Sequence, residues 1–134
     1  MTNKNLEKYP AIICDLDGVL ADPSSIRQFF PENLNSREQW DMYATHYGKC
    51  RVNQPILDLL KCFLEQNYTI LFVTSREQTS VGELLTRYWL DYNCGFNENN
   101  YKLLMRPYNC YDPSADVKEK IYLEQIKDNY DVKF

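Results

Sequence analysis

Long hydrophobic runs are missing from this sequence, and so is any segment with the character of a targeting signal. No stretch approaches the roughly 20 apolar residues that are needed to span a bilayer. The opening residues, MTNKNLEKYP, contain no apolar core of the kind that a secretory signal needs. We therefore expect a soluble cytoplasmic protein that makes no membrane contact.

Metal-binding cysteine pairs and basic runs are also missing. The five cysteines are odd in number, widely spread and without a C-x-x-C pair, which predicts free thiols rather than a zinc site or disulfides. The formal net charge is -4, from 15 basic and 19 acidic residues, and the basic residues do not cluster. Because a long phosphate-tracking groove needs a basic patch, we expect no extended duplex binding, whereas a single phosphate or one nucleic-acid end stays open.

What the chain does contain is enough apolar material for one compact core. Of its 134 residues 44% are hydrophobic, and there is no repeat or Gly/Ser linker, so we expect one domain over residues 1–134. Continuous apolar runs, typical of strands buried on both faces, occur at residues 10–16, 68–74 and 101–106. The last residues, 130–134, could begin a fourth strand.

Helical patterns separate these strands. Pro55 suits the first position of a helix, and Ser80 followed by Glu83 has the spacing of a capping box. Asp112 with Pro113 can cap a third helix. The alternation of strand and helix predicts an α/β fold, in which right-handed crossovers join a parallel sheet that helices cover on both faces.

Residues 22–52 interrupt this alternation. The segment is too long for an ordinary connection and has a capping pattern of its own, Ser36 with Gln39, followed by an aromatic stripe at helical spacing. We expect a small helical insert over the sheet edge that acts as a cap and limits access to the site. The stripe consists of Trp40, Tyr43 and Tyr47.

Two acidic residues end the first predicted strand, in the sequence AIICDLDGVLAD. Side chains alternate along an extended chain, so Asp15 and Asp17 should face one side while Leu16 faces the other, and Gly18 permits a sharp turn. Ligands of open parallel sheets bind beyond the carboxyl ends of the strands. Neighbouring carboxylates repel unless a cation lies between them, and an all-oxygen site favours Mg2+. The alternative is that the acids only cap a turn, since Asp-Gly is a common turn pair.

The string DLDGVLAD resembles the first motif of the haloacid dehalogenase (HAD) superfamily of phosphohydrolases. The resemblance implies a Rossmann-like three-layer core in which Asp15 attacks phosphorus and Asp17 acts as general acid and base. It also implies a Mg2+ ion held by the Asp15 carboxylate and the Asp17 backbone oxygen. An aspartyl-phosphate splits one difficult displacement into two easier ones, and a metal lets one anion approach another.

Two later stretches resemble further HAD motifs. LFVTSRE places Thr74 where the second motif has a hydroxyl that hydrogen-bonds the phosphoryl oxygens, and ADVKEKIYLEQI places Lys118 where the third motif has a lysine that holds phosphate and nucleophile together. A lysine in the first turn of a helix opposes the helix dipole, which a nearby negative ligand would explain. The alternatives are a strand-end hydroxyl for Thr74 and a solvated side chain for Lys118.

Most of the chain also resembles the phosphatase domain of phage polynucleotide kinase/phosphatase, in the segments VTSRE, LTRYWLDY and LLMRPYNCYDPSADVKEKIYLEQI. This resemblance implies a nucleotide or nucleic-acid 3'-phosphate as substrate, with a 5'-nucleotidase or small-metabolite phosphatase as the alternative. It makes Arg76, Arg106 and Arg27 candidates for substrate binding, because guanidinium pairs with phosphate through two parallel hydrogen bonds. Ser75 stands where the resembling proteins usually have glycine.

The fourth HAD motif, acids after the fourth strand that complete the metal site, has no counterpart, and Asp128 and Asp131 follow no apolar strand. We therefore expect a C-terminally shortened core. A fragment, a shortened enzyme that holds its metal less tightly and a catalytically inactive binding protein remain as alternatives. Without a fourth strand, the strand that carries Asp15 would have an exposed edge, through which two copies could pair as a homodimer.

Overall fold

A four-stranded parallel sheet forms the centre of the protein, whose computed structural model describes residues 8–134. Its strands are β1 (Tyr9–Cys14), β4 (Thr69–Glu77), β5 (Tyr101–Arg106) and β6 (Tyr130–Val132), in the spatial order β5-β4-β1-β6. The predicted α/β fold with a parallel sheet is confirmed, and the last residues do form a fourth strand.

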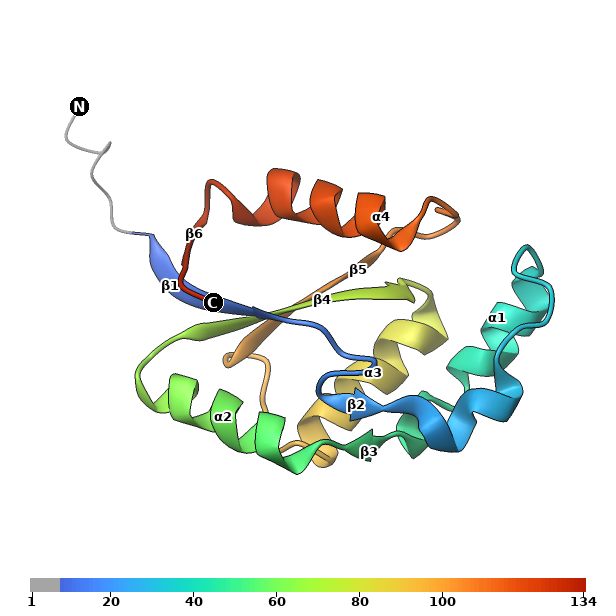
Figure 1. Cartoon of the computed structure of the whole chain (residues 1–134), viewed down its shortest axis with the longest axis horizontal. Coiled ribbons are helices and arrows are strands. Elements are labelled where there is room, and N and C mark those ends of the chain that lie inside the picture. The colour runs from blue at the N-terminus through green and yellow to red at the C-terminus, as the bar shows by residue number, and fades with distance from the viewer. Residues whose placement is uncertain (1–7) are drawn as a thin grey trace.

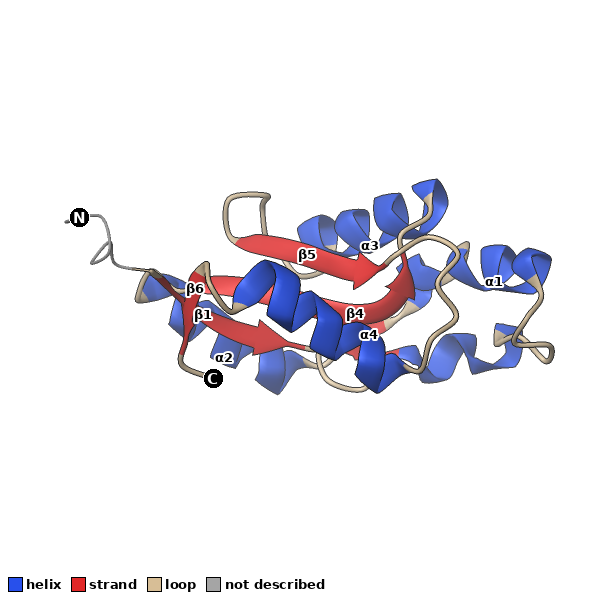
Figure 2. Ribbon diagram, turned by 90° about the horizontal axis from the view of Figure 1, so that it is seen from above, coloured by secondary structure: helices blue, strands red, loops and turns tan. Residues whose placement is uncertain are grey.

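Helices cover both faces of the sheet, which gives three layers (Figure 1). α2 (Gln54–Glu65) and α3 (Ser80–Tyr92) lie on one face, and α4 (Ser114–Ile121), continued by a π-helical turn over Tyr122–Ile126, lies on the other. Figure 2 shows α4 stretched over the sheet, where it packs on β1 and β4. Within residues 8–134, no helix has both the length and the apolar character required to cross a membrane.

The two cores take alternate residues of the same strands, because successive side chains of a strand point to opposite faces. The core under α2 and α3 is the larger and includes the fully buried Trp89. From β1 and β4 it receives Ile12, Ile70 and Phe72, whereas the core under α4 receives Ala11, Leu71 and Val73.

The helix α3 starts close against the end of β4. Thr79, rather than the predicted Ser80, caps it, because the Thr79 hydroxyl accepts the Gly82 N–H at 2.9 Å. Glycine is needed at this contact, since a Cβ on Gly82 would lie 2.8 Å from Thr79 Oγ1 and 2.9 Å from the Glu77 carbonyl oxygen. The carboxyl end of β4 therefore runs directly into the first turn of α3.

A short antiparallel pair closes the base of the insert, β2 (Ala21–Asp22) with β3 (Arg51–Val52). Between these strands lie the 3₁₀-helix η2 (Pro23–Phe29), the helix α1 (Arg37–Ala44) and the 3₁₀ turn η3 (Tyr47–Lys49). Both ends of the insert are thus held at one point, next to the turn that follows β1.

The insert lies beyond the carboxyl end of β4 and against α3 (Figure 1). The Ser36 hydroxyl caps α1 as predicted, accepting the Gln39 N–H at 3.2 Å. The insert thus covers the carboxyl end of the sheet rather than an edge strand, and Tyr43 and Tyr47 of its aromatic stripe are buried whereas Trp40 is half-buried. Tyr47 is 4% exposed, and its ring lies under the guanidinium of Arg76 at 4.0 Å.

β6 occupies the edge of β1 that was expected to be open. Residues 130–132 pair in parallel with residues 9–11, and the Ile13 N–H donates to the Phe134 carbonyl at 2.8 Å. The expectation of an exposed β1 edge is therefore wrong over these residues. The homodimer was predicted from that edge, so its structural basis is lost as well.

Candidate active site

The two acidic residues directly follow β1, at the carboxyl end of the strand. Leu16 between them is fully buried, whereas the side chains of Asp15 and Asp17 are each 35% exposed. Gly18 then turns the chain with a φ of +88°, and its N–H donates to the Ala21 carbonyl at 2.8 Å. Residues with a side chain are strained at this φ, so glycine sets the direction in which the chain leaves the acids.

Asp15 is paired with a lysine from the other end of the chain. Lys118 Nζ donates to Asp15 Oδ2 at 2.8 Å, and the Leu16 N–H donates to Oδ1 at 2.8 Å. Because α4 begins at Ser114, Lys118 lies in its second turn, and the predicted first-turn position is wrong. The negative partner expected for this lysine is the Asp15 carboxylate, whose two oxygens are both held in place.

Asp17 has a cation of its own. Arg76 donates from Nε to Oδ2 at 2.9 Å and from Nη2 to Oδ1 at 2.7 Å, which is the bidentate geometry that matches a guanidinium to a carboxylate. Arg76 is only 4% exposed. Burial lowers the pKa of its guanidinium, but the hydrogen bonds and charge of Asp17 outweigh burial and raise that pKa above its ordinary value. Arg76 therefore stays charged and holds Asp17 in one orientation.

Buried residues contact the guanidinium of Arg76 on the sides that do not face Asp17. Its Nη1 donates to the Thr86 hydroxyl at 3.1 Å, and its Nη2 lies 3.6 Å from Cys50 Sγ. The ring of Tyr47 covers one face of the guanidinium. A phosphate contact was expected of Arg76, but the structure directs its donors to Asp17 and to the core, so the geometry supports a positioning role instead.

Thr74 lies within β4, which continues to Glu77 rather than ending at Thr74 as predicted. Thr74 is 1% exposed, and its hydroxyl oxygen accepts the Arg76 N–H at 3.1 Å, which leaves the hydroxyl proton free to be donated. Ser75, which stands where the resembling proteins usually have glycine, hydrogen-bonds through its hydroxyl to the Ser114 hydroxyl at the start of α4. This contact ties the strand end to the helix that carries the lysine.

The two remaining arginines differ in their surroundings. Arg106 donates from Nε to the Ser75 carbonyl at 2.9 Å and from Nη1 to the carbonyls of Cys110 and Asp112 at 3.1 and 2.6 Å. It thereby fastens the loop after β5 to the end of β4. Arg27, in η2, is exposed, and within residues 8–134 its side chain forms no hydrogen bond or ion pair. Of the three arginine candidates, Arg27 offers a guanidinium that is free for an anionic ligand.

A cleft of about 960 Å³ opens between the insert and the carboxyl ends of β4 and β5. The wall of the cleft does not include Asp15, Thr74 or Lys118. Each of these residues nevertheless lies within one helical turn or two residues of a residue that lines the cleft. Ser75, for example, follows Thr74 and lines the cleft. The predicted site residues that do line the wall are Asp17, Arg27, Arg76 and Arg106.

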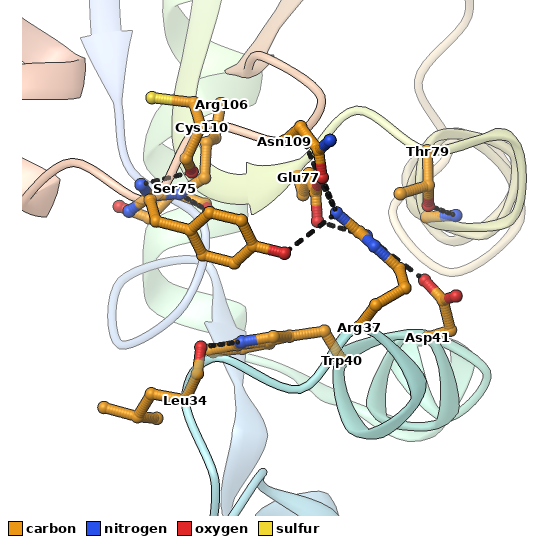
Figure 3. Close-up of polar contacts among 12 residues, drawn as sticks. Leu34, Arg37, Trp40, Asp41, Ser75, Glu77, Thr79, Arg106, Asn109 and Cys110 are labelled. Atoms are coloured by element: carbon orange, nitrogen blue, oxygen red, sulfur yellow. Dashed lines mark hydrogen bonds and ion pairs between the residues drawn. The ribbon is translucent and has the colours of Figure 1, made fainter.

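Arg37, in α1, forms a network that the sequence patterns did not indicate (Figure 3). Its Nη1 and Nη2 donate to the two carboxylate oxygens of Glu77 at 2.7 and 2.6 Å. Nη2 also donates to Asn109 Oδ1 at 2.9 Å and to Tyr111 Oη at 3.2 Å. Burial raises the pKa of Glu77, but the hydrogen bonds from Arg37 and Asn109 outweigh it, so the pKa lies below its ordinary value. The network fastens the insert to the end of β4.

The oxygen atoms available to a Mg2+ ion are few. Both carboxylate oxygens of Asp17 pair with Arg76, and each Asp15 oxygen accepts one hydrogen bond, so the donors left for a metal are the Asp17 backbone carbonyl and the second lone pairs of the Asp15 oxygens. In the part of the chain that the structure describes, no three His, Cys, Asp or Glu side chains gather in a metal-binding cluster. Because Mg2+ commonly keeps several waters and uses one or two carboxylates with substrate phosphate, these oxygens fit such an ion.

These features define a class of protein. A parallel sheet covered on both faces, acids directly after its central strand, a hydroxyl in the neighbouring strand and a lysine from the last helix form a Rossmann-like HAD core. The family model of the polynucleotide kinase PNKP phosphatase domain matches residues 9–134. The chain therefore belongs to this family of HAD-type phosphatase domains.

Solved structures with the same fold agree. A chain of the Pnkp1/Rnl/Hen1 complex matches with a TM-score of 0.70 and 28% identity, over 97% of this chain and 39% of that one. A chain of the Pnkp1/Rnl/Hen1 RNA repair complex gives 0.69 and 28%, over 95% and 35%. The class C acid phosphatase of Bacillus anthracis with tungstate bound gives 0.67 and 20%, over 98% and 52%, and shows the fold alone. The chain thus spans about a third to a half of these proteins, and no curated protein sequence matches it.

Proposed function

We propose that the protein is a phosphomonoester hydrolase in which Asp15 is the nucleophile and Asp17 the general acid and base. The observation that carries the proposal is that each carboxylate has its own cation, Lys118 at Asp15 and Arg76 at Asp17. The half-exposed lysine can turn to a phosphate, whereas the buried arginine can only hold its partner. Two acids that are close in the chain and equally exposed are thereby given different roles.

In the first step, an Asp15 oxygen attacks phosphorus, the bond from phosphorus to the leaving oxygen breaks, and the leaving oxygen takes its proton from Asp17, which must enter this step in its protonated form. In the second step, water attacks the aspartyl-phosphate and loses a proton to Asp17, and the bond from phosphorus to Asp15 breaks. Inorganic phosphate leaves, and both acids return to their starting states. The free hydroxyl proton of Thr74 can bind a phosphoryl oxygen, and Lys118 can hold phosphate and nucleophile together.

A Mg2+ ion fits this site through the Asp15 carboxylate and the Asp17 backbone carbonyl. When bound, it neutralises part of the charge that an anionic nucleophile meets as it approaches an anionic ester. Lys118 and Arg76 already compensate the two carboxylates. We therefore expect Mg2+ to act on the bound phosphate more than on the folding of the site.

We propose a nucleotide or a nucleic-acid 3'-phosphate as the substrate. The family match supports a nucleic-acid end, as do the two Pnkp1 complexes, one of which is an RNA repair complex. A net charge of -4 favours a single nucleotide or one strand end over an extended duplex. The five free cysteines fit a reducing compartment, and we place the enzyme in the cytoplasm.

The experiment that tests this function measures inorganic phosphate release, with and without Mg2+, from matched 3'- and 5'-phosphorylated nucleotides and oligonucleotides. Asp15→Asn should abolish release, whereas Asp128→Asn, the same change at an exposed acid away from the site, should not. A preference for 5'-phosphates would indicate a 5'-nucleotidase. No release from any substrate by folded protein would overturn the proposal in favour of a binding protein.

A further inference from the structure

The cleft has two chemically different parts. Asp17, Arg76 and Ser75 make its inner end polar. Its outer walls instead carry several aromatic side chains. Phe30 is 48% exposed, and Tyr111, on the opposite wall, is 50% exposed. An aromatic mouth that continues into a phosphate site matches a ligand with a flat ring at one end and a phosphate at the other.

Trp40, on the wall that the insert forms, is half-buried and packs partly against the larger core while lining the cleft. Its Nε1–H donates to the Leu34 carbonyl at 2.8 Å, so the polar edge of the indole is satisfied. Phe30 and Tyr43 meet it edge to face, at centroid distances of 5.4 and 6.1 Å. These contacts fix the plane of the ring. Figure 3 shows Trp40 edge-on, on the side of the cleft opposite Ser75 and Cys110.

The distance between the two walls is also fixed. Arg37, from the same helix as Trp40, donates to Tyr111 Oη at 3.2 Å and to Glu77 Oε2 at 2.6 Å. Arg106 binds the carbonyls of the loop that carries Tyr111, at 3.1 and 2.6 Å. A ligand that enters the cleft therefore meets a preformed slot and has few side chains to order, which reduces the entropic cost of binding.

We propose that this outer part of the cleft is a stacking site for the nucleobase of the substrate, with Trp40 as its platform and Phe30 and Tyr111 at its borders. The proposal rests on the function proposed above, because it assumes that the attached phosphate lies at Asp15. Every base presents a π-face, so stacking of this kind binds all bases with similar strength. Recognition through this stacking contact should therefore be independent of base identity.

A binding experiment tests the stacking site without any catalysis. The chain has two tryptophans, and Trp89 is fully buried, so a nucleoside without phosphate should quench the fluorescence of Trp40 alone. Adenosine should give saturable quenching, and ribose should give none. Trp40→Leu should remove the effect, whereas Tyr92→Leu, a change at an aromatic residue that is 73% exposed on α3, should retain it. Quenching that persists in Trp40→Leu overturns the proposal.

A kinetic experiment separates the stacking site from the hydrolase. The measured quantity is the ratio of kcat/KM for a nucleoside 3'-phosphate to kcat/KM for the abasic sugar 3'-phosphate. Stacking predicts a ratio of about tenfold or more in the wild-type protein, falling toward one in Trp40→Leu. Trp40→Phe keeps a ring and should keep more of the ratio, and Tyr92→Leu should keep all of it.

The outcomes tell the two proposals apart. If the wild-type protein hydrolyses both substrates equally well, the hydrolase stands and the stacking site is overturned. If neither substrate releases phosphate but adenosine quenches Trp40, the stacking site stands and the hydrolase fails. If a protein segment or a non-aromatic phosphate ester occupied the cleft, adenosine would not quench and the abasic substrate would be equally good.

Discussion

Neutralising Asp17 should destabilise the protein more than neutralising Asp15, although both side chains are 35% exposed. Asp17→Asn leaves Arg76, which is 4% exposed, with a buried charge that has no counter-ion. The new amide group also points a donor at one of the two N–H groups that Asp17 accepts. Removing one partner of a buried ion pair costs about 3–5 kcal/mol, and partial exposure of Asp17 reduces this to about 2–3 kcal/mol.

Asp15→Asn makes the same chemical change against a different partner. Lys118 is 33% exposed and can turn its ammonium group to water, and the amide oxygen of Asn can still accept the Leu16 N–H. Ion pairs of this exposure contribute about 0–1 kcal/mol, so the loss should stay below about 1 kcal/mol. Both variants should lose phosphate release, but only one should lose much stability.

Urea unfolding followed by circular dichroism measures the difference, provided that the urea dependence of the unfolding free energy is equal in all variants. The double change Asp17→Asn with Arg76→Met should regain part of the loss, because it removes the unpaired charge. Equal free energies of unfolding for Asp15→Asn and Asp17→Asn would refute the reasoning, since they would mean that Arg76 does not depend on Asp17.

Three further changes test other contacts. The pKa of Glu77 is lower in the folded than in the unfolded protein, so its stabilising contribution is present above the unfolded pKa and is lost as pH falls through the folded pKa. Glu77→Gln should therefore be less stable than wild type near neutral pH, and the difference should disappear in acid. Urea unfolding at several pH values measures this difference. Gly18→Ala meets no atom within 4 Å but is strained at a φ of +88°, so it should cost about 1–2 kcal/mol in the same assay. Trp89→Phe removes the hydrogen bond to the Cys50 carbonyl at 2.8 Å and leaves a cavity in the core; a loss of about 2–4 kcal/mol is expected, and an unchanged melting temperature would contradict it.

The strands were predictable because their signal is local. Uninterrupted apolar runs predicted the positions of β1, β4 and β5, and the motif around Asp15 and Asp17 predicted a site at the end of β1. The end of β4 was missed because Arg76 and Glu77 read as polar residues that should terminate a buried strand. The strand continues because Asp17 is present to pair with Arg76 in the interior, and that partner is 59 residues away in the sequence.

The partners of the site residues could not be predicted either, because they are also distant in the sequence. Lys118 could be predicted as a site residue from its motif, but its pairing with Asp15 spans 103 residues. The aromatic stripe of the insert was visible as a helical pattern around Trp40, yet its place facing a cleft depends on Arg37 and Glu77, which are 40 residues apart. No local pattern carries such pairs, since each residue alone is typical of a solvated surface.

The end of β4 links the acid chemistry to the insert. Adjacent residues of a strand point to opposite sides, so Arg76 and Glu77 reach different partners. Arg76 turns inward and holds Asp17, while Glu77 turns outward and holds Arg37 of the insert. Because both contacts start from one stretch of backbone, the end of β4 determines both the orientation of the proposed general acid and the position of the wall that carries Trp40.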